Sequence, residues 1–149
     1  MADKNATPLS PQEAPWTHWM ERGVQYAHFP LRLALVAVFT YRFIAIWQDP
    51  RGYGDTAGVP VFAAVLAAVG LMAIVGLVIA GAMENLPQAD AATRLAGFLT
   101  TTAMLFSIGF MHAGRWDAAA TAAHPLGGME HQVTLALIGL YLMLRGNRI

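Results

Sequence analysis

One uninterrupted apolar stretch constrains this chain more than any other feature. No charged residue occurs between positions 59 and 83, and a helix that crosses a bilayer needs roughly 20 predominantly apolar residues. The whole chain has 149 residues, of which 56% are hydrophobic and only 12% are charged. A soluble domain of this size would lack polar surface. We therefore expect an integral membrane protein.

Four apolar segments and their short loops account for most of the chain. The fourth segment is unusual, because its uninterrupted apolar run, 133–144, would cover only about 18 Å of a roughly 30 Å hydrocarbon core. A fourth span must therefore begin near Leu126, which places Glu130, His131 and Gln132 inside the membrane or at its edge. The expected spans are residues 29–47, 59–83, 95–111 and a fourth from about 126 to 144.

The segment before the first span has two parts. Residues 1–15 are polar and contain three prolines, so they are expected to form a flexible cytoplasmic tail. Residues 16–28 have an amphipathic helical pattern with two tryptophans, which suits an interfacial helix or a docking surface for a partner subunit. The expected fold is all-α: a four-transmembrane-helix bundle in residues 29–149, preceded by this interfacial amphipathic helix.

Basic residues near the ends of the spans predict the orientation, because cytoplasmic loops carry an excess of lysine and arginine. Only Arg51 and Arg115 fall on the opposite side. Both termini are therefore expected in the cytoplasm, and in a bacterium the chain would be a multi-pass protein of the inner (cytoplasmic) membrane. The residues on the cytoplasmic side are Lys4, Arg22, Arg32, Arg94, Arg145 and Arg148.

Two local patterns predict how the spans pack. Residues 48–55 contain proline, glycine and aspartate, which predicts a loop joining the first two spans as an antiparallel pair. Alanine and glycine recur along the second span from Ala63 to Gly81. Small residues allow close approach of helices in lipid, so the second span is expected to be the central packing helix.

Arg42 lies within the first span, where a charged residue needs a partner or a polar cavity. Its height along the helix is close enough to that of Glu130 for the long guanidinium to bridge the difference. We expect a structural ion pair between Arg42 and Glu130, whose rupture would leave a buried charge. Two alternatives stay open: these residues line a polar ligand pocket, or Arg42 extends its charged group to the membrane surface.

Three histidines are expected on one side of the membrane. His112 ends the third span, His131 begins the fourth, and His124 lies between them. They could contact a quinone or a proton, bind a metal, or bond to loop carbonyls and water. Because no metal-binding spacing such as H-E-x-x-H occurs, no metal site is assigned. The candidate pocket residues are Arg42, His112, Glu130 and His131.

The sequence resembles the DoxX-like family of small four-helix membrane proteins, relatives of the small subunit of thiosulfate:quinone oxidoreductase. The resemblance begins at residues 31–35 (LRLAL), which Val38 and Phe39 follow. It continues with residues 94–96 (RLA) at the third span and residues 128–130 (GME) before a short fourth helix that ends at 145–146 (RG). One departure matters: residues 69–76 contain no carboxylate, whereas many members carry an acid there. A proton-carrying role of that acid therefore does not transfer.

The resemblance implies an accessory membrane subunit of a quinone-linked electron-transfer complex, without catalytic activity of its own. The alternatives are an oxidoreductase subunit that forms a quinone pocket and a small transporter. The expected partners are the lipid bilayer and larger membrane redox subunits. Nucleic acid is excluded as a partner, since no basic run occurs. No intrinsic cofactor is expected: cysteine is absent, the centres of the spans contain no histidine for haem, and quinone is the one cofactor considered.

Overall fold

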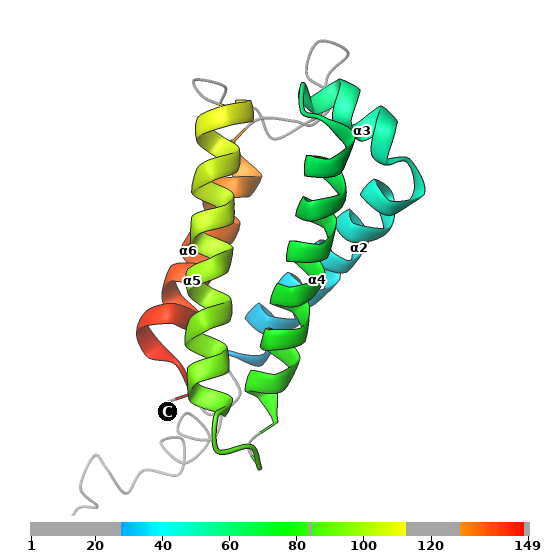
Figure 1. Cartoon of the computed structure of the whole chain (residues 1–149). Helices are drawn as coiled ribbons and strands as arrows, with labels where there is room; N and C mark the ends of the chain where they lie inside the picture. Colours follow the sequence, from blue (N-terminus) through cyan, green and yellow to red (C-terminus); the bar gives the residue numbers. More distant parts are fainter. Residues whose placement is uncertain (1–27, 84, 113–128, 148–149) are drawn as a thin grey trace, which may run out of the picture.

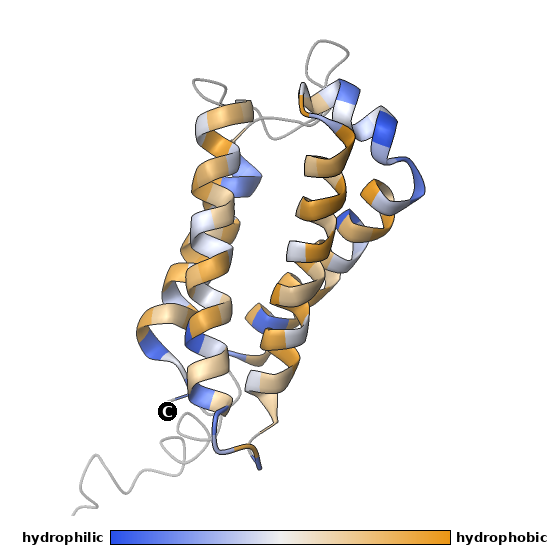
Figure 2. Ribbon diagram, viewed as in Figure 1, coloured by the Kyte–Doolittle hydropathy of each residue, from blue (hydrophilic) through white to orange (hydrophobic). Residues whose placement is uncertain are grey.

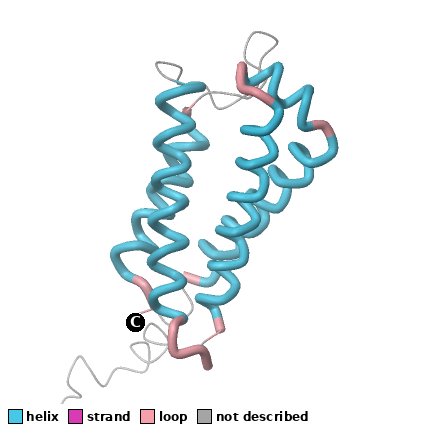
Figure 3. Tube along the Cα trace, in the orientation of Figure 1, coloured by secondary structure: helices cyan, strands magenta, loops and turns pink. Residues whose placement is uncertain are grey.

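The computed structural model describes residues 28–83, 85–112 and 129–147, and the regular structure in these ranges is helical (Figures 1 and 3). The tail 1–15 and the interfacial helix predicted for 16–28 lie outside this part, apart from residue 28. The elements are α2 (Phe29–Gln48), α3 (Pro50–Ala57), α4 (Val61–Ala82), α5 (Ala89–Ser107), the π-helical turn η2 (Ile108–His112) and α6 (Glu130–Arg145).

Three helices are long and apolar enough to cross a membrane: α2, α4 and the continuous segment Ala89–Met111. This finding supports the expectation of a helical membrane protein. The observed α2 and α4 agree with the predicted first and second spans to within two residues at each end. The third span begins at Ala89 rather than at residue 95, because Asp90 and Arg94 are accommodated in its first turns.

The prediction of a loop at residues 48–55 was wrong in part, because the helix α3 occupies most of this segment. The Asp49 side chain accepts a hydrogen bond of 2.9 Å from the backbone N–H of Gly52, and Pro50 occupies the first helical position. Both features favour the start of a helix. Gly58 ends it with a left-handed backbone (φ 68°). The Asp49 cap and the left-handed Gly58 stabilise the two ends of this short helix, although the glycines within it weaken helix formation.

The fourth helix, α6, has 16 residues and begins at Glu130. At 1.5 Å per residue it is about 24 Å long. The start predicted near Leu126 lies outside the described residues, so this prediction is not tested. Within the described part, Glu130 and His131 stand in the first turn of α6.

The helices pack in the order α2, α4, α5, α6, with α4 in contact with α2, α3 and α5 (Figure 1). The start of α2, the end of α4, the start of α5 and the end of α6 meet at one end of the bundle. We call this the Arg32 end. The opposite end, next to α3, is called the α3 end. The predicted antiparallel arrangement of α2 and α4 is confirmed.

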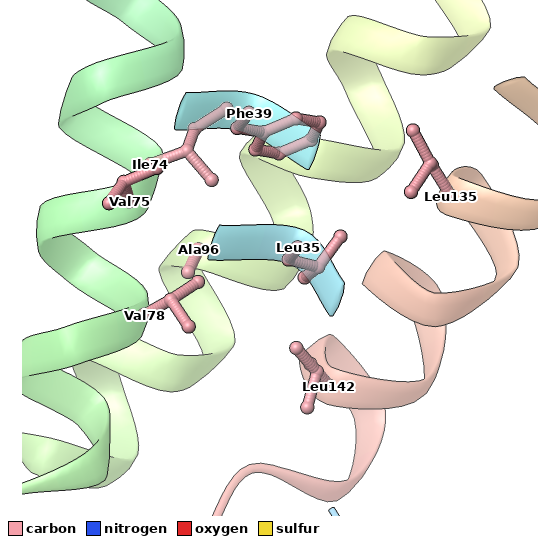
Figure 4. Packing of buried hydrophobic residues seen from close by; sticks show 8 residues of the cluster. All are labelled: Leu35, Phe39, Ile74, Val75, Val78, Ala96, Leu135 and Leu142. Carbon is pink, nitrogen blue, oxygen red and sulfur yellow. The ribbon is translucent and has the colours of Figure 1, made fainter. Parts of the chain in front are cut away.

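The core of the bundle lies between all four long helices and is made of side chains that are at most 4% exposed. Residues from α2 and α4 face residues from α5 and α6 across this core (Figure 4). Van der Waals contacts between such closely packed side chains are a main source of cohesion inside a helical bundle in lipid. The cluster comprises Leu35, Phe39, Ile74, Val75, Val78, Ala96, Leu135 and Leu142.

α5 and α6 approach each other closely. A Cβ atom on Gly139 would lie 2.8 Å from the carbonyl oxygen of Gly97 and 2.7 Å from the hydroxyl oxygen of Thr101. The Thr101 hydroxyl also lies 3.2 Å from the carbonyl oxygen of Ala136 across the seam. Only glycine fits at such a contact. Small residues thus bring α5 and α6 together at this seam. On α4, Ala64, Ala68 and Gly81 are buried as well, and a Cβ atom on Gly81 would collide with Thr93 of α5.

The outer surface of the bundle is apolar, and polar residues gather toward its ends (Figure 2). Large side chains such as Phe62, Leu66 and Phe110 are 67–76% exposed. On α4, Gly70 and Gly76 have open space above them. Extended apolar surface of this kind marks contact with lipid or with other protein.

Candidate functional site

At the Arg32 end, a buried arginine connects several helices. Arg32 on α2 is only 6% exposed. Its Nη1 donates to the carbonyl oxygen of Gly81 at the end of α4 (3.0 Å), and its Nη2 donates to the hydroxyl of Thr93 on α5 (3.0 Å). Nη2 also donates to the side-chain oxygen of Asn147, just after α6. Hydrogen bonds from a charged group are stronger than those between neutral groups. The bonds from Arg32 therefore stabilise the packing of α2 against α4, α5 and the end of α6.

Asn147 completes the arrangement around Arg32. Its Oδ1 accepts a second hydrogen bond, from the Thr93 hydroxyl (2.6 Å), and its Nδ2 donates to the Gly81 carbonyl (2.8 Å). Its backbone N–H donates to Oδ1 of Asp90 (2.7 Å). Asn147, a single residue that lies beyond the end of α6, is thereby bonded to α2, α4 and α5.

A second arginine holds the end of α6. Arg94 on α5 forms a salt bridge with Asp90 (2.8 Å), its neighbour one turn earlier. Its Nη1 and Nη2 donate to three consecutive carbonyl oxygens of α6, at 3.0–3.2 Å. The last carbonyls of a helix have no partner within the helix and carry partial negative charge, so Arg94 caps α6. The Arg32 network is Arg32, Gly81, Asp90, Thr93, Arg94 and Asn147.

This network is not predicted by the sequence. The sequence patterns assign Arg32 and Arg94 to the cytoplasmic side and to the segments that resemble DoxX-like proteins, and they predict no contacts for either residue. The Asp90–Arg94 pair could have been found, because residues four apart lie on one helix face. The bonds to Gly81 and Asn147 connect residues 49 and 115 positions from Arg32, and no local pattern reports such contacts.

At the α3 end, the predicted site residues are arranged differently. Arg42 is half-buried on α2, and Glu130 and His131 are exposed at the start of α6. The positive charge of Arg42 is close enough to interact electrostatically with the His131 imidazole. Arg42 and Glu130 are both among the residues that the structure describes, and within this part of the chain no salt bridge joins their side chains. The structure therefore does not contain the direct ion pair predicted between them.

The remaining candidates divide between the described and undescribed parts. Gln132, in the first turn of α6, is buried. His112 is the last residue of η2, but its side chain is outside the described part, as is the whole of His124. The predicted convergence of three histidines stays a prediction. Within residues 28–83, 85–112 and 129–147, no three His, Cys, Asp or Glu side chains are grouped to hold a metal.

The α3 end thus offers a half-buried guanidinium near an imidazole. Both groups can donate hydrogen bonds to a carbonyl or anionic oxygen. Comparison of the chain with protein-family models, with curated proteins and with solved structures finds no match in any of the three.

Proposed function

We propose that the protein is an accessory membrane subunit of a quinone-linked electron-transfer complex. In this proposal α6 completes a four-helix transmembrane bundle in a bacterial inner membrane, with the Arg32 end facing the cytoplasm. Arg32, Arg94 and Arg145 lie toward this end, whereas Arg51 lies on α3, and an excess of arginine favours the cytoplasmic side. The link to quinone chemistry rests on the resemblance to DoxX-like proteins.

The observation that carries the accessory role is the outward face of α4. Gly70 and Gly76 stand in open space there, and Leu66, Val69 and Met72 beside them are exposed. Glycine weakens a helix interior relative to alanine, but it allows a neighbouring helix to approach closely in lipid. A larger membrane subunit packed on this face would approach closely at the two glycines and contact the exposed apolar side chains beside them.

Affinity purification from the native membrane in mild detergent tests this proposal. We expect the tagged chain to retain redox subunits, identified by mass spectrometry, and Gly76→Leu to lose them. Gly109→Leu is the matched control, because Gly109 also has open space above it but lies outside α4. Recovery of the unmodified chain without redox subunits would contradict the accessory role.

A second function is favoured by Arg42. This half-buried arginine interacts electrostatically with His131. Its guanidinium makes no hydrogen bond within the described residues, so the guanidinium N–H groups are available to a quinone carbonyl. In this alternative the chain itself forms a quinone pocket with Arg42, His131, Glu130 and His112. Quinone extracted from the purified chain alone would support it. Arg42→Gln should then lower the quinone content, whereas Arg51→Gln, on the exposed surface of α3, should not.

A further inference from the structure

The residues after α6 bond the helix pair α5–α6 to the rest of the bundle. Asn147 donates to Gly81 of α4, and its Oδ1 accepts from Arg32 of α2 and Thr93 of α5. These bonds are partly buried, because Asn147 is half-buried while Arg32 and Thr93 are at most 6% exposed. A residue outside the helices therefore reaches into the polar interior of the Arg32 end.

The backbone at Gly146 directs Asn147 into this position. Gly146 has φ 62°, a conformation that residues with a side chain rarely adopt. A Cβ atom there would collide with the Asp90 carboxylate and with Nε of Arg94, which it would approach to 2.8 Å. Asp90 accepts the Asn147 backbone N–H on one oxygen and Arg94 on the other. We call Gly146 and Asn147 the hook.

Few hydrogen bonds cross between the two helix pairs. α2 packs extensively on α4, and α5 packs extensively on α6. α4 and α5 form the largest contact between the pairs, and the shared apolar core, with Leu35 of α2 and Leu142 of α6, adds to it. Within the described residues, the hydrogen bonds from α2 to the α5–α6 side are those of Arg32 to Thr93 and Asn147. The hook is thus placed where it can control the separation of α2 from α6.

We propose that the hook is a latch for the Arg32 end. When Asn147 is inserted, it fixes α2 against α5 and α6 through Arg32. When Asn147 withdraws, Arg32 and Thr93 lose their shared acceptor and α2 separates from α6 at this end. The Arg94 cap does not depend on the Asn147 side chain, so α6 stays helical in both states.

Distance measurement between two spin labels tests the latch. The chain contains no cysteine, so Leu33→Cys on α2 and Leu144→Cys on α6 give one labelled pair. Both side chains are exposed and make no contact in the network; of these two residues, only the backbone carbonyl of Leu144 takes part, as an acceptor for Arg94. Double electron–electron resonance on the full chain in lipid nanodiscs should show one narrow distribution of distances between the two spin labels. Asn147→Ala should add a longer-distance population.

Two further variants make the result specific. Thr93→Val keeps the side-chain shape but removes the hydroxyl between Arg32 and Asn147, so it should give a smaller long-distance population. Asn85→Ala removes a similar side chain from the exposed turn between α4 and α5 and should leave the distribution unchanged. The latch is refuted if Asn147→Ala and Thr93→Val both retain the narrow distribution, or if Asn85→Ala broadens it equally.

Discussion

Two arginines of the same helix have opposite surroundings. Arg32 is almost fully buried, and its guanidinium donates to oxygens from α4, α5 and the hook. Arg42, at the α3 end, is half-buried and has no hydrogen bond within the described residues. A buried charge is tolerated only where hydrogen-bond acceptors surround it. The difference shows that the Arg32 guanidinium is bonded inside the bundle, whereas the Arg42 guanidinium has no comparable bonds among the described residues.

The largest expected effect comes from removing each arginine in turn. Arg32→Ala should lower the free energy of unfolding by about 3 kcal/mol, since it deletes charged hydrogen bonds and leaves buried acceptors behind. Arg42→Ala should cost less than about 1 kcal/mol. Unfolding in mixed detergent micelles at increasing SDS measures both values. Equal losses would break the comparison between the two ends.

The seam between the ends offers the next largest effect. Gly139→Ala should destabilise the protein by about 2 kcal/mol, because its Cβ would collide with the Gly97 carbonyl and Thr101. Gly76→Ala is the matched control on the open face of α4. It should leave stability unchanged or raise it by up to about 1 kcal/mol, since alanine favours helix. If both variants behave alike in the same SDS titration, the close seam is not present in the membrane.

The cap on α6 should matter less than Arg32, because Arg94 is partly exposed. Arg94→Gln should lower stability by about 1 kcal/mol, since it replaces charged bonds to the last α6 carbonyls with weaker ones. Amide hydrogen exchange should then accelerate at the carboxyl end of α6. Exchange that is unchanged there would show that the cap contributes nothing.

The smallest effect is expected at Glu130. Because Glu130 is exposed and no salt bridge joins it to Arg42, Glu130→Gln should change stability by less than about 0.5 kcal/mol. The same unfolding titration measures this. A loss as large as that of Arg32→Ala would instead restore the ion pair predicted from the sequence and make the two ends alike.

Helices that depend on apolar length could be predicted from the sequence, and features that depend on distant contacts could not. The positions of α2 and α4 follow from hydropathy alone. The short helix α3 was missed because its stability depends on the Asp49 cap and on Gly58, which outweigh its weak helix formers. Close packing was expected along α4. Ala64, Ala68 and Gly81 are buried there, but Gly70 and Gly76 face outward, and another close contact joins Gly97 to Gly139. Which glycine meets another backbone is decided by tertiary packing.

The Arg32 network also imposes an order on biogenesis. Asn147 follows Arg32 by 115 residues, so at a typical synthesis rate about 6 to 23 s separate the two. During this interval α2 enters the bilayer before the residue that completes its hydrogen bonds exists. Gly81 and Thr93 are synthesised earlier and are the bundle partners that Arg32 has in this interval. The acceptor that Asn147 supplies has to be replaced by water or lipid phosphate until α6 has been inserted.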